Sequence, residues 1–278
     1  MTVLTFTAAV GAASVAAGFL GALTGLGGGV VIVPLLVLVF HVDIHYAIGA
    51  SLVSVIATSS GAAAAYVRDG YSNVRAGMFL EIATTVGALS GALIATSVPA
   101  SGLAVVFGCV LLYSAFVSGH RADPVDADAP PDRWGALLRL DSVYPTPAGL
   151  QAYRVQRVPA GFGLMYVAGI LSGLLGIGSG AVKVLAMDWA MRLPFKVSTT
   201  TSNFMIGVTA AASAGVYLHR GYIDPVLAMP VVLGVLVGAT QGARVLESAP
   251  PRRLRHVFTW VIVALAIEML INGSMGRL

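Results

Sequence analysis

The sequence has very little charge and almost no residues suited to covalent, redox or metal chemistry. Charged residues make up 10% of the chain and hydrophobic residues 57%, which leaves too little polar surface to coat a water-soluble globule. Cys109 is the only cysteine, which excludes a disulfide within the chain and a cysteine-based metal cluster. The sequence has no nucleophile elbow, phosphate-binding loop, paired-carboxylate signature or metal-ligand spacing. We therefore expect no enzymatic activity, no metal and no cofactor.

Long apolar runs are abundant instead, and the mean hydropathy is +0.88. Each half of the chain contains five apolar segments, and the second segment of each half is short. The ten segments are 4–23, 30–40, 44–67, 77–98 and 102–119, then 159–175, 181–191, 197–218, 225–246 and 254–271. A helix needs roughly 20 apolar residues to cross the hydrocarbon core, so a short segment covers about half of it. The pattern predicts an all-α, polytopic integral membrane protein.

A Gly-rich break inside an apolar stretch occurs twice, 151 residues apart. Residues 25–29 read Gly-Leu-Gly-Gly-Gly and residues 176–180 read Gly-Ile-Gly-Ser-Gly. Without any gap, the same offset places Gly18 on Gly169, Ser51 on Ser202, Thr58 on Thr209, Tyr66 on Tyr217, Gly87 on Gly238 and Gly91 on Gly242. This match indicates an internal duplication. Paired interrupted segments in the two halves of a membrane protein are typical of a transport site.

Each break admits two interpretations: a kink within one long helix, or the tip of a hairpin whose short arm returns to the side from which it came. Reversal puts most of the positive charge on one side, as the positive-inside rule expects, and leaves only Arg220 and Arg277 on the other. The first side then holds Arg68, Arg75, Arg121, Arg133, Arg139, Arg154, Arg157, Arg192, Lys196, Arg244, Arg252, Arg253 and Arg255. A simple kink would divide these residues more evenly, so we predict reversal.

Two inverted repeats follow from reversal, each with a Gly-rich re-entrant hairpin and three full transmembrane helices. The repeats are 1–119 and 158–278, and 120–157 forms a cytoplasmic Pro-rich loop between them. We expect a multi-pass protein of the inner (plasma) membrane with both termini outside. Within the loop, 121–132 is acidic and Pro-rich and is expected to be disordered. Alternating polar and apolar residues over 138–157 predict a small β-hairpin. A solvated linker and a regulatory element fit this loop equally well.

Hairpin tips of this kind favour an anion. The glycines allow the chain to reverse, and the short helices that follow point their N-termini, with unpaired N–H groups and positive dipole ends, into the protein. Lys183 lies one turn into the second short helix, where the first copy has Ile32. An ionisable residue inside the membrane usually has a function. Two alternatives remain open: the glycines serve only close helix packing, and Lys183 extends to the surface or pairs with Glu81 or Glu268.

Hydroxyl and amide groups at the start of the next long helix could complete an anion's coordination shell. Serine and threonine are also common at helix starts for structural reasons alone, so this pattern is less specific than the glycine clusters. The predicted substrate-binding residues are Gly27, Gly28, Gly29, Ser51, Gly178, Ser179, Gly180, Lys183, Thr201, Ser202 and Asn203.

The residues around both breaks resemble a known family. Residues 169–180 (Gly-Ile-Leu-Ser-Gly-Leu-Leu-Gly-Ile-Gly-Ser-Gly), Val182-Lys183-Val184 and the Ser/Thr-rich run in 196–210 are similar to the TauE/SafE family of sulfite and sulfonate exporters, also called TSUP transporters. Residues 18–34 resemble the N-terminal motif of the same family. The resemblance implies a membrane carrier that exports sulfite, sulfoacetate or a related small anion. Ser179 departs from the family, whose members often have glycine there.

The expected partners are therefore a small anion and the lipid bilayer, with no nucleic acid. The sequence leaves the oligomeric state open, a homo-oligomer included. Export by alternating access is the main hypothesis. An anion channel would use the same helix ends, and a membrane sensor or scaffold would act through the cytoplasmic loop.

Overall fold

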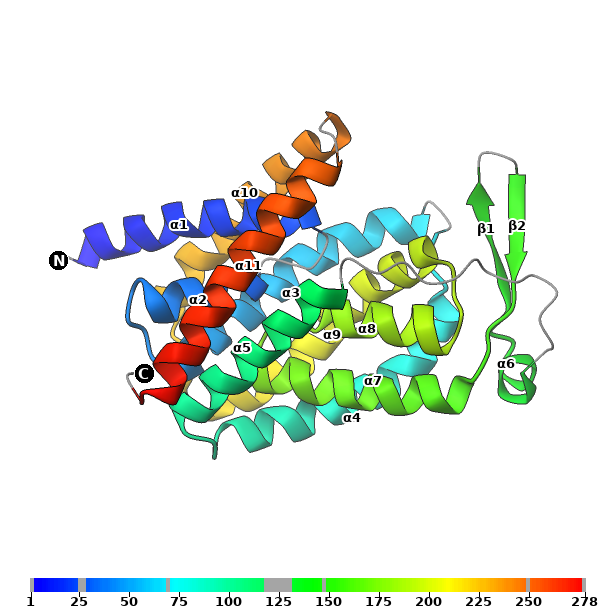
Figure 1. The fold of residues 1–278 in the computed structure, drawn as a ribbon, viewed down its shortest axis with the longest axis horizontal. Coiled ribbons are helices and arrows are strands. Elements are labelled where there is room, and N and C mark those ends of the chain that lie inside the picture. Colours follow the sequence, from blue (N-terminus) through cyan, green and yellow to red (C-terminus); the bar gives the residue numbers. More distant parts are fainter. Residues whose placement is uncertain are drawn as a thin grey trace.

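The helices of the protein begin and end close to the predicted apolar segments. The computed structural model describes residues 3–24, 29–68, 71–117, 132–146, 149–248 and 251–276. The first half contains α1 (Val3–Thr24), α2 (Gly29–Leu38), α3 (Ile44–Arg68), α4 (Val74–Ala95) and α5 (Ala100–Val117). The second half contains α7 (Val158–Leu175), α8 (Gly180–Leu185), the π-helical turn η1 (Ala186–Ala190), α9 (Phe195–His219), α10 (Pro225–Ser248) and α11 (Pro251–Ser274). Figure 1 shows these helices as one bundle.

Four of the described helices are long and apolar enough to cross a membrane, and they occupy the first and fourth positions of each half. Their apolar stretches are Leu4–Gly21, Val74–Ala95, Val158–Leu175 and Pro225–Gly242. On α4, the outward side chains of Met78, Ile82 and Val86 are 62%, 59% and 52% exposed. Large apolar side chains outside and small ones between helices are typical of a protein surrounded by lipid. The chain is therefore a polytopic membrane protein.

At each break, residues just after the short helical segment contact residues near the start of the long helix before it. At the first break, the ring of Phe6 near the start of α1 lies 5.8 Å from the ring of Phe40 just after α2. At the second break, Gln156 N just before α7 donates a hydrogen bond of 3.0 Å to Met191 O just after η1. Each short helical segment thus ends beside the start of the long helix that precedes it.

The two returning segments also end in the same way. Val42 N donates to Leu36 O in the first half, and Leu193 N donates to Met187 O in the second, both at 3.0 Å. His41 and Arg192, which occupy equivalent positions, both have left-handed backbone, with φ of 53° and 58°. The two halves therefore share even individual backbone hydrogen bonds at equivalent positions.

The halves interlock through two equivalent helix crossings, α1 with α10 and α7 with α4. A Cβ atom added at Gly18 would lie 2.5 Å from Val235 O, and one added at the equivalent Gly169 would lie 2.2 Å from Thr84 O. Val235 and Thr84 are themselves equivalent under the 151-residue offset. Only residues without a side chain allow backbones to approach so closely. The pairs α3 with α9 and α5 with α11 join like helices.

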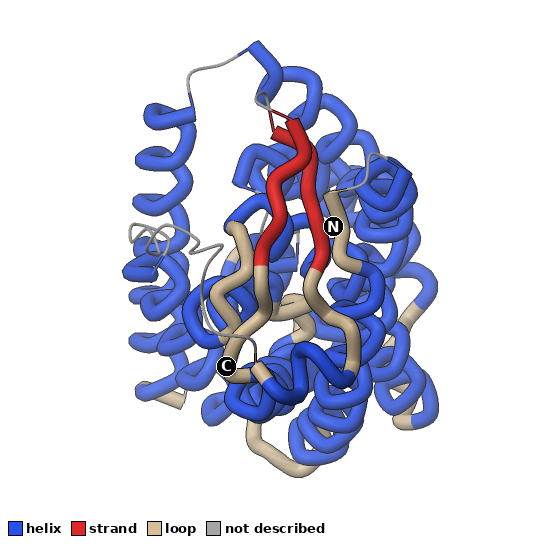
Figure 2. Tube along the Cα trace, turned by 90° about the vertical axis from the view of Figure 1, so that its right-hand side faces the viewer, coloured by secondary structure: helices blue, strands red, loops and turns tan. Residues whose placement is uncertain are grey.

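The connection between the halves forms a small polar layer at one end of the bundle. It contains α6 (Arg133–Leu137) and the antiparallel strands β1 (Ser142–Thr146) and β2 (Gly149–Tyr153), with Ser142 opposite Tyr153. Figure 2 shows this hairpin lying across the end of the bundle. Both chain ends lie at the opposite end in Figure 1. The loop expected to be disordered, 121–132, falls outside the described residues except for Asp132, whose side chain caps α6.

Hydrogen bonds of Asn73 connect the β-hairpin and Leu140 to α4 and α9. Asn73 Oδ1 accepts from Ala76 N and caps α4, while its Nδ2 donates to Leu140 O at 2.8 Å and to the Tyr153 hydroxyl at 2.9 Å. Its backbone N donates to Thr201 Oγ1 on α9 at 3.0 Å. Burial raises the pKa of Tyr153 to about 12, so the Tyr153 hydroxyl keeps its proton at any physiological pH.

The glycine crossings generate a stability prediction. Gly169→Ala places a methyl group against Thr84 O, and overpacking of this kind costs about 1–3 kcal/mol. We expect its melting temperature in detergent to fall by several degrees, and Gly18→Ala to cause a similar loss. Gly163→Ala, on the same helix, is the matched control, because no atom lies within 4 Å of the position that its Cβ would take. Equal melting temperatures for the Gly163 and Gly169 variants would contradict the close crossing.

Candidate functional site

The second break is built on left-handed backbone. Gly176, Gly178 and Ser179 have φ of 65°, 69° and 44°. For serine this conformation is strained, which explains why glycine would suit position 179. The Ser179 hydroxyl donates back to Ala168 O on α7 at 2.7 Å. Its proton is thus used to hold the turn in this conformation.

Gly29, which follows the first break, packs beside the second break. Ser51 Oγ on α3 donates to Gly176 O at 2.8 Å, which joins the first half to the second break. A Cβ atom at Gly29, the first residue of α2, would lie 2.7 Å from Ser51 Oγ and 3.1 Å from Gly176 O. Ser202 Oγ on α9 donates to Gly180 O at 3.2 Å. The sequence-predicted residues Gly29, Ser51, Gly180 and Ser202 are therefore brought together.

A buried polar network lies one turn beyond the second break. Lys183 on α8 has no solvent-exposed surface, and its Nζ donates to Thr209 Oγ1 on α9 at 2.5 Å. Thr209 Oγ1 lies 2.7 Å from Glu81 Oε1 on α4, to which it can donate. Thr85 Oγ1 donates to the same carboxylate oxygen at 3.2 Å. The network thus connects three helices and joins a buried cation to a buried carboxylate through one hydroxyl.

The hydroxyl of Thr209 has a single proton and two candidate acceptors. Besides Glu81 Oε1, the carbonyl oxygen of Met205 lies 2.9 Å away. It can donate to only one of them at a time. The second carboxylate oxygen, Glu81 Oε2, is buried and has no hydrogen-bond partner among the residues that the structure describes. The network therefore has unused capacity at Glu81 Oε2 and at the remaining N–H groups of Lys183.

The network exists in only one copy of the duplication. Under the 151-residue offset, Ile32 takes the place of Lys183 and Val232 the place of Glu81, while Thr58 is equivalent to Thr209. Thr58 Oγ1 instead donates to carbonyls of its own helix, Ser54 O and Val55 O. The polar centre of the protein is therefore asymmetric although the surrounding helices are not.

The other sequence-predicted residues divide into three groups. Gly27 and Gly28 lie outside the described residues. Gly178 lies in the second break, close to Ile206 and Val55. Thr201 lies away from the break, because its hydroxyl accepts from Asn73 N beside the hairpin, and Asn203 is partly buried on the same helix.

Sequence reasoning missed Thr209 and considered Glu81 only as an alternative partner for Lys183. Two signals pointed to them: Thr209 is one of the positions retained in the duplication, and Glu81 is the only carboxylate in 77–98.

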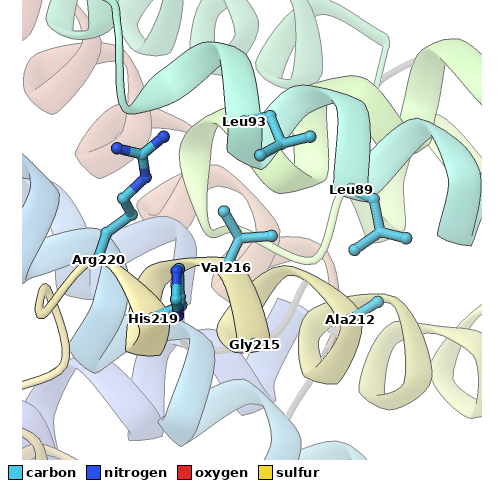
Figure 3. Close-up of a pocket in the computed structure, with 7 residues that line it drawn as sticks. All are labelled: Leu89, Leu93, Ala212, Gly215, Val216, His219 and Arg220. Atoms are coloured by element: carbon cyan, nitrogen blue, oxygen red, sulfur yellow. The ribbon is translucent and has the colours of Figure 1, made fainter.

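An open groove of about 740 Å³ continues along the seam between α4 and α9, as Figure 3 shows. Leu89 and Leu93 line it from α4, Ala212 and Val216 from α9, and Arg220 lies at its end. Ala212 is one turn beyond Thr209 on α9. The groove thus extends from the level just past the buried network toward the end of the bundle that holds the chain termini.

Comparisons with known proteins agree with this architecture. The sulfite exporter TauE/SafE family profile matches residues 10–269. The chain is 26% identical over 266 residues to the probable membrane transporter protein YunE of Bacillus subtilis, covering 92% of this chain and 94% of that protein. It is 28% identical over 234 residues to the probable membrane transporter protein YdhB of the same organism, covering 84% and 86%. The probable membrane transporter protein MJ0441 of Methanocaldococcus jannaschii is 22% identical over 271 residues, covering 91% of each chain. No solved structure matches the chain.

The bridging hydroxyl can be tested with a matched pair of variants. Thr209→Val keeps the side-chain volume but removes the group between Lys183 and Glu81, and an unsatisfied buried polar group costs about 1–3 kcal/mol. We expect a clear loss of thermal stability in detergent. Thr58→Val, at the equivalent position in the first half, should change stability by about 0.5 kcal/mol or less. Equal losses in the two variants would show that the network does not stabilise the fold.

Proposed function

This chain belongs to the sulfite exporter TauE/SafE family of membrane transporters, and from that premise we propose that it exports a small sulfur-containing or organic anion by alternating access. Sulfite, sulfoacetate and related sulfonates are the proposed substrates. The single observation that carries the proposal is Lys183, a fully buried cation placed beside the junction of the two breaks.

The proposed topology has two inverted repeats with re-entrant hairpins. Two observations support it. Each short helical segment ends near the start of the long helix before it, and the two segments end at opposite ends of the bundle. The first return ends near the chain termini and the second ends near the β-hairpin. The starts of α4 and α9, which hold Arg75 and Lys196, lie toward the hairpin end, and the end of α9, which Arg220 follows, lies toward the other. The positive-inside rule then assigns the hairpin to the cytoplasm and the termini to the outside.

The proposed anion site is centred on Lys183 and the junction of the breaks. The hydroxyls of Ser51, Ser179 and Ser202 donate to main-chain carbonyls in this conformation, so they are not the principal anion donors here. An anion needs donors, and Lys183 Nζ has three N–H groups, of which Thr209 receives one. Backbone N–H groups of residues 27–29 and 178–180 and the side chain of Asn203 remain predicted ligands, whereas Thr201, whose hydroxyl accepts from Asn73 N, lies away from this centre.

Transport requires the breaks to move apart, because Gly29 is packed against Ser51 and Gly176. We assign this conformation to a closed centre with a groove along α4 and α9 that leads toward the outer end. Opening of the centre toward the groove would release the anion outside. An inside-negative potential favours this direction by about 2.3 kcal/mol per negative charge per 100 mV.

The proposal predicts which anions bind. In a thermal-shift screen of the purified protein against sulfite, sulfate, thiosulfate, sulfoacetate, taurine and simple carboxylates, we expect stabilisation by the sulfur oxyanions. Saturable counterflow of the bound anion in liposomes would support a carrier. Ohmic single-channel currents would assign the protein to the anion channels instead. Transport that is unchanged after deletion of residues 122–131 would argue against a sensor acting through the loop.

Lys183→Met tests the site itself. A charge-assisted hydrogen bond is worth about 1.5–3 kcal/mol, so we expect the affinity for the stabilising anion to fall at least about tenfold. Lys196→Met is the matched control, because Lys196 is exposed on the next helix and stacks 3.7 Å from the Tyr71 ring. Should Lys183→Met fail to fold, the double variant Lys183→Met with Glu81→Gln removes both charges together. Wild-type affinity in either variant would refute the site.

A further inference from the structure

Glu81 is the part of the buried network that anion coordination does not explain. It is 8% exposed, and its Oε1 accepts from Thr209 and Thr85. Its Oε2 has no hydrogen-bond partner within the described part of the chain. A carboxylate placed beside the only buried lysine of the described residues already neutralises the charge that a substrate anion would use.

Among the residues that the structure describes around Glu81, Lys183 is the one cation, and no second one could balance an added anion. Lys183 reaches it from α8 through Thr209 of α9. On its own helix the neighbours are the hydroxyls of Thr84 and Thr85. From α7, the residues that touch α4 most closely are Gly169 and Gly173, which carry no charge. Asp188, on η1, has no hydrogen bond to Lys183 or Glu81 among those of the described residues. An anion beside Lys183 and an ionised Glu81 would therefore leave at least one uncompensated negative charge in a buried site, and two when the anion is divalent, as sulfoacetate is; a proton on Glu81 removes one of them.

We propose that Glu81 is a proton-binding residue that takes up one proton whenever the substrate anion binds at Lys183. This inference rests on the proposed function and specifies the ion coupling of that site. The free protein holds a neutral pair, Lys183 ammonium and Glu81 carboxylate. In the loaded protein the anion pairs with Lys183, and the proton, taken from the water on the side to which the site is open, resides on the Glu81 carboxyl. No other bond forms or breaks.

The geometry provides for both states. With Glu81 ionised, Thr209 donates to Oε1 and accepts from Lys183. With Glu81 protonated, the Thr209 hydroxyl can turn to Met205 O, and the unpartnered Oε2 offers a place for the proton. Neither state requires a backbone change in α4 or α9. Thr209 is a positioning residue in this scheme, since it holds the carboxyl and the ammonium at one hydroxyl's distance from each other.

The coupling has a direct calorimetric signature. We would titrate sulfoacetate into the purified full chain in buffers of different ionisation enthalpy, between about pH 5.5 and 8.5, where the charge of sulfoacetate itself stays constant. The slope of binding enthalpy against buffer ionisation enthalpy gives the number of protons taken up. The expected result is a slope that approaches one proton per anion as the pH rises, and an affinity that falls about tenfold per pH unit in the same range. This wild-type measurement does not depend on any variant folding.

Glu81→Gln assigns the proton to its residue. The amide keeps an oxygen for Thr209 but cannot titrate, so proton uptake and the pH dependence of affinity should both vanish while sulfoacetate still binds. Glu268→Gln is the matched control, because Glu268 is exposed on α11, and it should behave as wild type.

The outcomes separate this inference from the proposed function. Binding by the wild type without proton uptake at any pH overturns the coupling and leaves the anion site intact. Uptake that persists in Glu81→Gln assigns the proton to another group, such as Lys183, and also overturns the inference. Absence of sulfoacetate binding, both in the wild type and in the Glu81→Gln variant, removes the sulfonate proposal and the coupling with it.

Discussion

The structure depends on how a protein keeps an ammonium group in a membrane without exposing it to lipid. Lys183 is fully buried, and the side chain that it contacts by a hydrogen bond among the described residues is a neutral hydroxyl, that of Thr209. The balancing carboxylate of Glu81 lies one hydrogen bond farther, on a different helix. In a direct buried Lys–Glu ion pair, the two charged groups would bind each other, and separating them to bind a substrate would be costly. Separation of the two charges by Thr209 keeps them electrostatically coupled while leaving each with unused hydrogen-bonding capacity.

The second constraint is the close approach of backbones, which fixes where that network can lie. The crossing of α7 with α4 brings Gly169 against Thr84 O, and this crossing places the next turn of α4, with Glu81, opposite α9. The same crossing recurs between α1 and α10 with Gly18 and Val235. In water, two helices could be joined by large apolar side chains, but in lipid such side chains gain nothing by leaving the surface. Hence Met78, Ile82 and Val86 face outward while glycine fills the interface.

Much of the fold could be predicted from sequence because apolar length and a gap-free repeat are both local signals. The helix limits, the short second segment of each half and the hairpin near 142–153 agree with the structure. The site was predicted less completely. From the sequence, the hydroxyl groups of Ser51, Ser179 and Ser202 could bind a ligand. In the structure they donate to main-chain carbonyls, and these contacts depend on which backbone segments meet in three dimensions. Thr209 has no local motif, and its role follows only from α8, α9 and α4 meeting at one point.

Two oppositely oriented halves can change sides by exchanging conformations, each taking the shape that the other had before. If the halves were identical, the two resulting states would have equal free energy and the resting protein would be divided evenly between them. Ile32 and Val232 replace Lys183 and Glu81 in the other copy, so the exchange does not return an equivalent molecule. Under the proposed inverted-repeat mechanism, the divergence of these positions would give the empty transporter an intrinsic preference for one side of the membrane, set by its own side chains before any gradient acts.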